Sequence, residues 1–122
     1  MNRLSTVIAA LVLATPAMAA QTVTLIWPED TRSGDTYFAE LTGLQDEIVG
    51  QYLMSVAPDD TSIVPADDGA NICFWPASGA KIIKALHGVY FDNPIALVPD
   101  RGTGKTCLSL FDNKSTEWDV AF

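Results

Sequence analysis

The stretch TGLQDEIVGQYLMSVAP, residues 42–58, decides the fold class that the sequence predicts. Thr42 and Gln45 have the spacing of a capping box, which is typical of a helix N-terminus. The apolar side chains that follow recur at helical intervals: Leu44, Ile48, Tyr52 and Val56. Pro58 stops this pattern, so we predict a helix that begins at Thr42 and ends before Pro58.

Strands are predicted on both sides of this helix. Residues 22–27 alternate apolar and polar side chains, as a half-buried strand does, and residues 71–75 have the composition of a short buried strand. Residues 35–41 fit either a returning strand or the start of the helix, and we favour the strand. Residues 58–69 are acidic and rich in turn formers, which is typical of a surface loop.

A second helix is predicted to begin at Ser78, a good N-cap, and to end at Gly88. Strands follow to the end of the chain, at 89–91, 95–98, 105–111 and 116–122. The four turn formers at 112–115 predict that the last two strands form a hairpin. The expected fold is therefore α+β, a small single domain with a mainly antiparallel sheet, two helices and a C-terminal β-hairpin or meander.

Residues 1–19 have the three parts of a secretory signal peptide. Arg3 is basic, residues 7–14 are all apolar, and residues 17–19 are Ala-Met-Ala, which matches the A-x-A cleavage pattern. The apolar run is much shorter than the roughly 20 residues that span a bilayer. We expect cleavage of 1–19 to leave one mature domain, residues 20–122, that is periplasmic or secreted and does not insert into the membrane.

The two cysteines, Cys73 and Cys107, are predicted to form a disulfide. In an oxidising compartment a small domain with two thiols is most simply cross-linked once. Their spacing matches neither a C-x-x-C redox pair nor a cluster of zinc ligands.

The charge of the chain is strongly acidic, with 15 Asp and Glu against 7 Lys and Arg and a formal net charge of −8. Loss of Arg3 with the signal would make the mature domain more acidic still. Binding to nucleic acid or to an anionic membrane requires a positive surface, so we exclude both as partners. A basic protein partner is compatible with this charge.

The candidate binding residues are acidic or aromatic. Four aspartates flank one predicted loop, and tryptophans often anchor protein contacts. The candidates are Asp59, Asp60, Asp67, Asp68, Trp75 and Trp118. Clustered oxygen ligands suit Ca²⁺, but the spacing is not that of an EF-hand, and we predict no metal site.

No cofactor is predicted. The stretch 102–106, Gly-Thr-Gly-Lys-Thr, resembles the end of a phosphate-binding loop, but Pro99 stands where that motif requires its first glycine. His87, the single histidine, is predicted to lie in the last turn of the second helix, where it would complement the helix dipole.

Because no catalytic motif is complete, we expect a binding protein rather than an enzyme. The first hypothesis is an inhibitor, immunity or accessory protein that contacts another envelope or secreted protein. The alternative is a small secreted hydrolase that uses His87 or the clustered aspartates, and it requires these groups to converge in one cleft. A third is an envelope component that self-associates through its terminal strand.

Overall fold

Strands make up all the regular structure that is described. The computed structural model describes residues 21–89, 95–111 and 116–122, and these contain no helix. Their strands are β2 (Thr22–Ile26), β3 (Thr36–Thr42), β4 (Ile48–Ser55), β5 (Thr61–Pro65), β6 (Asn71–Pro76), β7 (Ala85–Gly88), β8 (Ala96–Leu97), β9 (Thr106–Ser109) and β10 (Glu117–Ala121). They form a five-stranded sheet, in the order β5-β2-β10-β7-β8, and a four-stranded sheet, in the order β4-β3-β6-β9.

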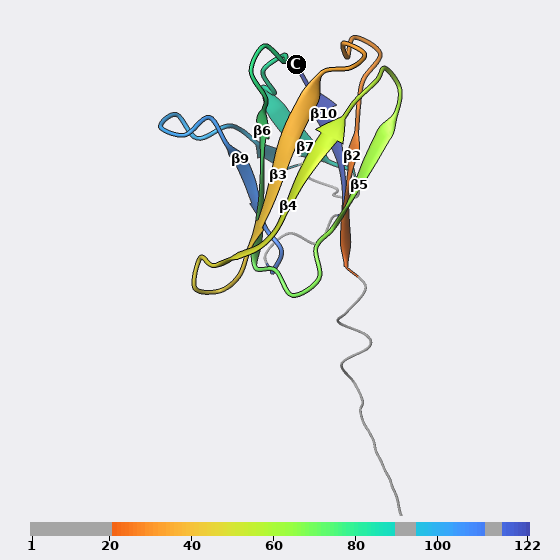
Figure 1. The fold of residues 1–122 in the computed structure, drawn as a ribbon. Coiled ribbons are helices and arrows are strands. Elements are labelled where there is room, and N and C mark those ends of the chain that lie inside the picture. Colours follow the sequence, from red (N-terminus) through yellow and green to blue (C-terminus); the bar gives the residue numbers. More distant parts are fainter. Residues whose placement is uncertain (1–20, 90–94, 112–115) are drawn as a thin grey trace, which may run out of the picture.

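The two sheets pack face to face as a β-sandwich (Figure 1). The core lies between them and takes side chains from both, including Leu25 and Trp118 from the five-stranded sheet and Tyr37 and Phe74 from the four-stranded sheet. All four are fully buried. Burial of each such side chain stabilises the fold by roughly 1.5–3 kcal/mol, so the packed inner faces hold the two sheets together.

The predicted α+β class is wrong, and the stretch 42–58 is the first reason. Residues 43–47 form a tight turn, in which the Gly43 N–H donates to the Glu47 carbonyl and Asp46 has a positive φ of 62°. β4 then pairs antiparallel with β3. The buried side chains Met54 and Val56 are two residues apart, as in a strand, whereas Leu44 and Ile48 of the predicted helical face are exposed.

The second predicted helix, from Ser78 to Gly88, is also absent. Gly79 has a φ of 85°, outside the helical region, and forms part of a turn. Residues 82–85 alternate between exposed and buried, with Ile82 and Lys84 exposed and Ile83 and Ala85 buried, which is the two-residue period of an extended chain. Residues 85–88 form β7, so His87 lies on a strand and not at a helix C-terminus.

Two further predictions, the loop at 58–69 and the C-terminal hairpin, are also wrong. Residues 58–69 are not one loop, because β5 lies in their middle with Val64 buried and Ile63 exposed. The last two strands do not pair as a hairpin, since β9 belongs to the four-stranded sheet and β10 to the five-stranded sheet. Their connection, 112–115, lies outside the described residues, as do the predicted signal 1–19 and most of the strand predicted at 89–91.

The terminal strand β10 has neighbours on both sides. It runs parallel to β2 and antiparallel to β7, and the other paired strands among the described residues are antiparallel. Because both edges of β10 are occupied, self-association by adding a strand to it is excluded.

The strands predicted at 22–27, 35–41 and 71–75 are confirmed as β2, β3 and β6.

The predicted disulfide is confirmed. Cys73 on β6 lies opposite Cys107 on β9, and their sulfur atoms are 2.04 Å apart. Disulfides of this kind persist in oxidising compartments. Among the described residues, no helix has the length and hydrophobicity needed to cross a membrane.

Candidate binding surface

The outer face of the four-stranded sheet carries a row of apolar side chains. Phe38 on β3 lies opposite Leu53 on β4 and, on its other side, opposite Trp75 on β6. Side chains directly opposite on neighbouring strands share a face, so the three form a continuous row across the sheet. Leu53 is 62% exposed and Phe38 37%. We call these three residues the apolar row.

The rings of the apolar row are held in place by their neighbours. Phe38 and Trp75 stack with centroids 5.5 Å apart and an interplanar angle of 27°. The Lys105 ammonium lies 4.3 Å from the centroid of the Trp75 ring. A stacked pair and a cation over the ring restrict the side-chain freedom of Trp75, so less entropy remains to be lost when a partner binds.

A hollow of about 330 Å³ lies along the apolar row. Its lining combines side chains of the row with the neighbouring β3 and β4: Phe38, Ala39, Gln51, Tyr52, Leu53 and Trp75. An apolar side chain of a partner would find aromatic and aliphatic surface in this hollow, which is what the centre of a protein interface provides. A smaller hollow of about 140 Å³ lies at the end of the sandwich, between Leu44 and Phe111.

Polar side chains border the apolar row on the same face. The Gln51 amide donates to Glu40 Oε2 at 3.0 Å, and Lys105 Nζ lies 3.8 Å from Glu40 Oε1. In register, Gln51, Glu40, Cys73 and Cys107 form the row next to the apolar one. The disulfide therefore links β6, which carries Trp75, to β9, which directly follows Lys105. The face has the apolar centre and polar rim of a contact surface.

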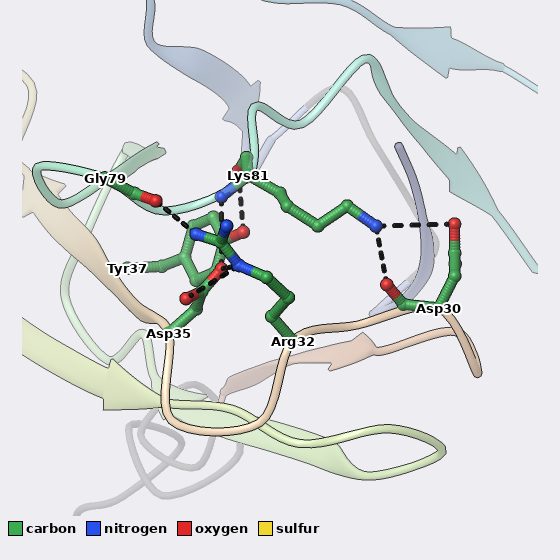
Figure 2. Close-up of polar contacts among 6 residues, drawn as sticks. All are labelled: Asp30, Arg32, Asp35, Tyr37, Gly79 and Lys81. Atoms are coloured by element: carbon green, nitrogen blue, oxygen red, sulfur yellow. Dashed lines mark hydrogen bonds and ion pairs between the residues drawn. The ribbon is translucent and has the colours of Figure 1, made fainter.

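A second polar cluster lies where the β2–β3 loop meets residues 77–84 (Figure 2). Arg32 donates to the Asp35 carboxylate and to the Gly79 carbonyl, and the Lys81 N–H donates to Asp35 Oδ2 at 3.2 Å. Lys81 Nζ donates to the Asp30 carbonyl at 2.6 Å and pairs with the Asp30 carboxylate. Each charge has a partner within the cluster, and the contacts join the β2–β3 loop to the 77–84 segment.

Two groups in this cluster have shifted pKa values. The hydrogen bond from Arg32 holds the pKa of Asp35 below its usual 3.8, because it favours the carboxylate. Burial raises the pKa of Tyr37 to about 12, and the nearby Asp35 charge acts in the same direction. The Tyr37 hydroxyl donates to the Lys81 carbonyl at 2.6 Å, which ties β3 to the 77–84 segment.

The four candidate aspartates do not form one cluster. Asp59 and Asp60 lie in the turn before β5, and Asp67 and Asp68 in the turn after it. A strand of this length separates the two turns by about 15 Å. Asp60 accepts a hydrogen bond from the Thr61 N–H and Asp67 one from the Gln21 N–H. The described residues contain no group of three or more His, Cys, Asp or Glu side chains that could hold a metal ion.

The two candidate tryptophans have different environments. Trp75 belongs to the apolar row and borders the hollow. Trp118 is fully buried in the core, so a partner of the folded domain has no access to its ring. Sequence reasoning missed Phe38 and Leu53, although each stands at an outward position of an alternating segment. Their adjacency depends on the strand register, which no local pattern gives.

His87 and the aspartates also fail to converge. His87 lies exposed on β7, opposite Asp119 on β10. Two strands, β2 and β10, separate β7 from β5 and its flanking turns, a distance of about 14 Å at the usual strand spacing. The hydrolase hypothesis required these groups in one cleft, and their placement gives it no support.

The glycine-rich loop before β9 is closed on itself. Asp100 Oδ2 accepts hydrogen bonds from the Gly102 and Thr103 N–H groups at 3.0 and 2.9 Å. Gly104 has a φ of 72°, which explains the glycine at that position. A carboxylate therefore already occupies the amides that a phosphate would need.

Comparison with known proteins gives no match to a protein family, to a curated protein or to a solved structure. The geometry of the described residues is therefore the basis for the functional proposal.

Proposed function

We propose that this chain is an exported binding protein, periplasmic or secreted, that acts by contact with another envelope or secreted protein. An inhibitor, immunity or accessory protein works in this way. The observation that carries the proposal is the apolar row, Leu53, Phe38 and Trp75, exposed across three adjacent strands beside a hollow of about 330 Å³. Exposed contiguous apolar surface rimmed by polar groups typically marks a protein contact site.

Two further properties support the same proposal. The disulfide between Cys73 and Cys107 is of the kind found in exported proteins. The net charge of −8 favours a partner with basic groups near the contact, because complementary charge speeds encounter and disfavours wrong partners.

The test compares one substitution on each outer face of the sandwich. Leu53→Glu puts a charge into the apolar row, and Ile63→Glu makes the same change at an outward position of β5 that is 66% exposed. Both variants are expressed in the natural host and cross-linked to their partners in the cell. We expect Leu53→Glu to lose the cross-linked partner of the unmodified protein and Ile63→Glu to retain it. Retention by both variants, or absence of any cross-linked protein, would overturn the proposal.

A further inference from the structure

The outer edge of β4 is a second surface that a partner could use. β4 lies at the end of the four-stranded sheet and pairs with β3, and among the described residues no strand pairs with its other side. In a strand, alternate residues direct their N–H and C=O groups to opposite edges. Half of the backbone groups of β4 are therefore directed away from β3, ready to pair with an added strand.

β4 has few of the features that usually protect an edge: its one irregularity is a bulge at Val49, where the register with β3 shifts between Leu41 and Thr42. Its eight residues, Ile48–Ser55, include no charged residue and no proline. The other edge strands are shorter: β5 has five residues and ends in Pro65, β9 has four, and β8 has two. Short strands, prolines and charges discourage edge-to-edge pairing. β4 is thus the edge of the described fold most open to an added strand.

Side chains along β4 extend the apolar surface to this edge. Val49 and Leu53 are 43% and 62% exposed. Strand alternation places both on the outer face, with Gln51 between them. A strand added beside β4 would put its own apolar side chains next to Val49 and Leu53 and would continue the apolar row.

The charges at the two ends of β4 indicate what kind of strand fits. Asp46 and Glu47 lie exposed in the turn before it, and Asp59 and Asp60 lie exposed in the turn after it. If β4 of a second copy paired antiparallel with this edge, the acidic turn before one β4 would lie beside the acidic turn after the other. This contact between like charges would occur twice in each dimer and would be repulsive. A segment with basic residues at both ends would instead meet opposite charge at both ends.

We propose that β4 receives, as an added strand, an extended segment of the partner protein with alternating apolar residues between basic ends. This inference rests on the proposed function and specifies how the partner binds. Backbone hydrogen bonds along the edge would supply affinity, and the positions beside Val49 and Leu53 would supply specificity.

The probe is a library of random peptides of about ten residues, long enough to span β4. Selection against the oxidised protein should enrich peptides with lysine or arginine near both ends and alternating apolar residues between them. Backbone N-methylation at alternate residues of an enriched peptide then separates pairing from mere contact. Methylation of the set facing β4 should abolish binding, and methylation of the other set should leave it within about threefold, because a strand donates to each neighbour from alternate amides.

Matched variants locate the site. Val49→Lys should weaken binding of the enriched peptides at least tenfold, since it places a charge on the edge and repels their basic ends, whereas Ile63→Lys on β5 should not change it. Thermal unfolding checks that both variants fold. Failure to enrich such peptides, equal tolerance of both N-methylated sets, or unchanged binding to Val49→Lys would overturn the inference. A dimer in sedimentation equilibrium that Val49→Lys dissociates would also overturn it, by making a second copy the occupant.

The cellular partner bound by Leu53→Glu and Val49→Lys distinguishes failure of the added-strand proposal from failure of the proposed function. If Leu53→Glu loses the cellular partner while Val49→Lys retains it, the apolar row binds the partner without an added strand. If neither variant loses the partner, the proposed function itself fails.

Discussion

The two outer faces of the sandwich are built on the same strand alternation and differ in what they carry. On the four-stranded sheet, Leu53, Phe38 and Trp75 are neighbours in register and form a continuous apolar row. On the five-stranded sheet, the exposed Ile63 lies opposite Thr24, and Asp119 lies opposite His87. Alternation makes a sandwich possible, but the contiguity of the outward residues distinguishes a contact surface from an ordinary solvated face.

The largest expected effect concerns the cross-link on the four-stranded sheet. Replacing Cys73 and Cys107 together by alanine removes a link across 34 residues of sequence. By the loop-entropy argument this costs about 4 kcal/mol of unfolding free energy, and the urea midpoint measures it. Reduction of the unmodified protein is the control and should give a similar loss. A loss below about 1 kcal/mol would mean that sheet pairing alone constrains β6 and β9.

The next effect separates binding from stability on the apolar row. Phe38→Ala removes the ring that stacks on Trp75. We expect the affinity for the cellular partner to fall at least tenfold, which corresponds to about 1.4 kcal/mol. The unfolding free energy should fall by less than it does when a fully buried phenylalanine is replaced by alanine, because the Phe38 ring is partly exposed. Unchanged affinity would remove Phe38 from the contact surface.

A smaller effect tests the tie between β3 and residues 77–84 at high pH. The pKa of Tyr37 is raised from 10.0 to about 12, so the folded state favours the protonated phenol. The resulting stabilisation is present below pH 10 and is lost as the pH rises towards 12. One tyrosine should therefore deprotonate at a higher pH than an exposed tyrosine, which ultraviolet absorbance measures as a function of pH. Tyr37→Phe should abolish this step and cost about 1 kcal/mol through the lost hydrogen bond.

The smallest effect concerns the ion pair of the polar cluster. Because the pKa of Asp35 is held below 3.8 in the folded state, its stabilising effect is present above pH 3.8 and is lost as the pH falls through the lowered value. Asp35→Asn should flatten the dependence of the unfolding midpoint on pH in this acidic range. An unaltered acid profile in the variant would show that the pairing with Arg32 is too solvent-screened to matter.

How far the sequence predicted this fold depended on the strength of each local pattern. Residues 22–27 alternate and residues 72–75 are continuously apolar, and both segments lie in strands as expected. In the stretch 42–58, Leu44, Ile48, Tyr52 and Val56 matched a helical face by coincidence. The two-residue alternation of Tyr52, Met54 and Val56 indicated the strand, and the β-branched pair at 48–49 favoured it, while Gly50 weakened the helical alternative.

The binding surface was harder to predict than the strands. The disulfide followed from cysteine count and compartment, and Trp75 was among the candidates. Phe38 and Leu53 could not be grouped with it, because β3, β4 and β6 meet through a register that depends on the whole sheet. The placement of β9 and β10 in different sheets is likewise a long-range property, and the turn residues between them suggested a hairpin instead.

Site-specific photo-cross-linking in the natural host tests the central claim most directly. A benzophenone side chain replaces Leu53 on the four-stranded sheet in one strain and Ile63 on the five-stranded sheet in another. We predict that the label in place of Leu53 cross-links a single partner protein and that the label in place of Ile63 does not. Equal cross-linking of the same partner from both positions, or cross-linking from the Ile63 position alone, would contradict the assignment of the contact surface to the four-stranded sheet.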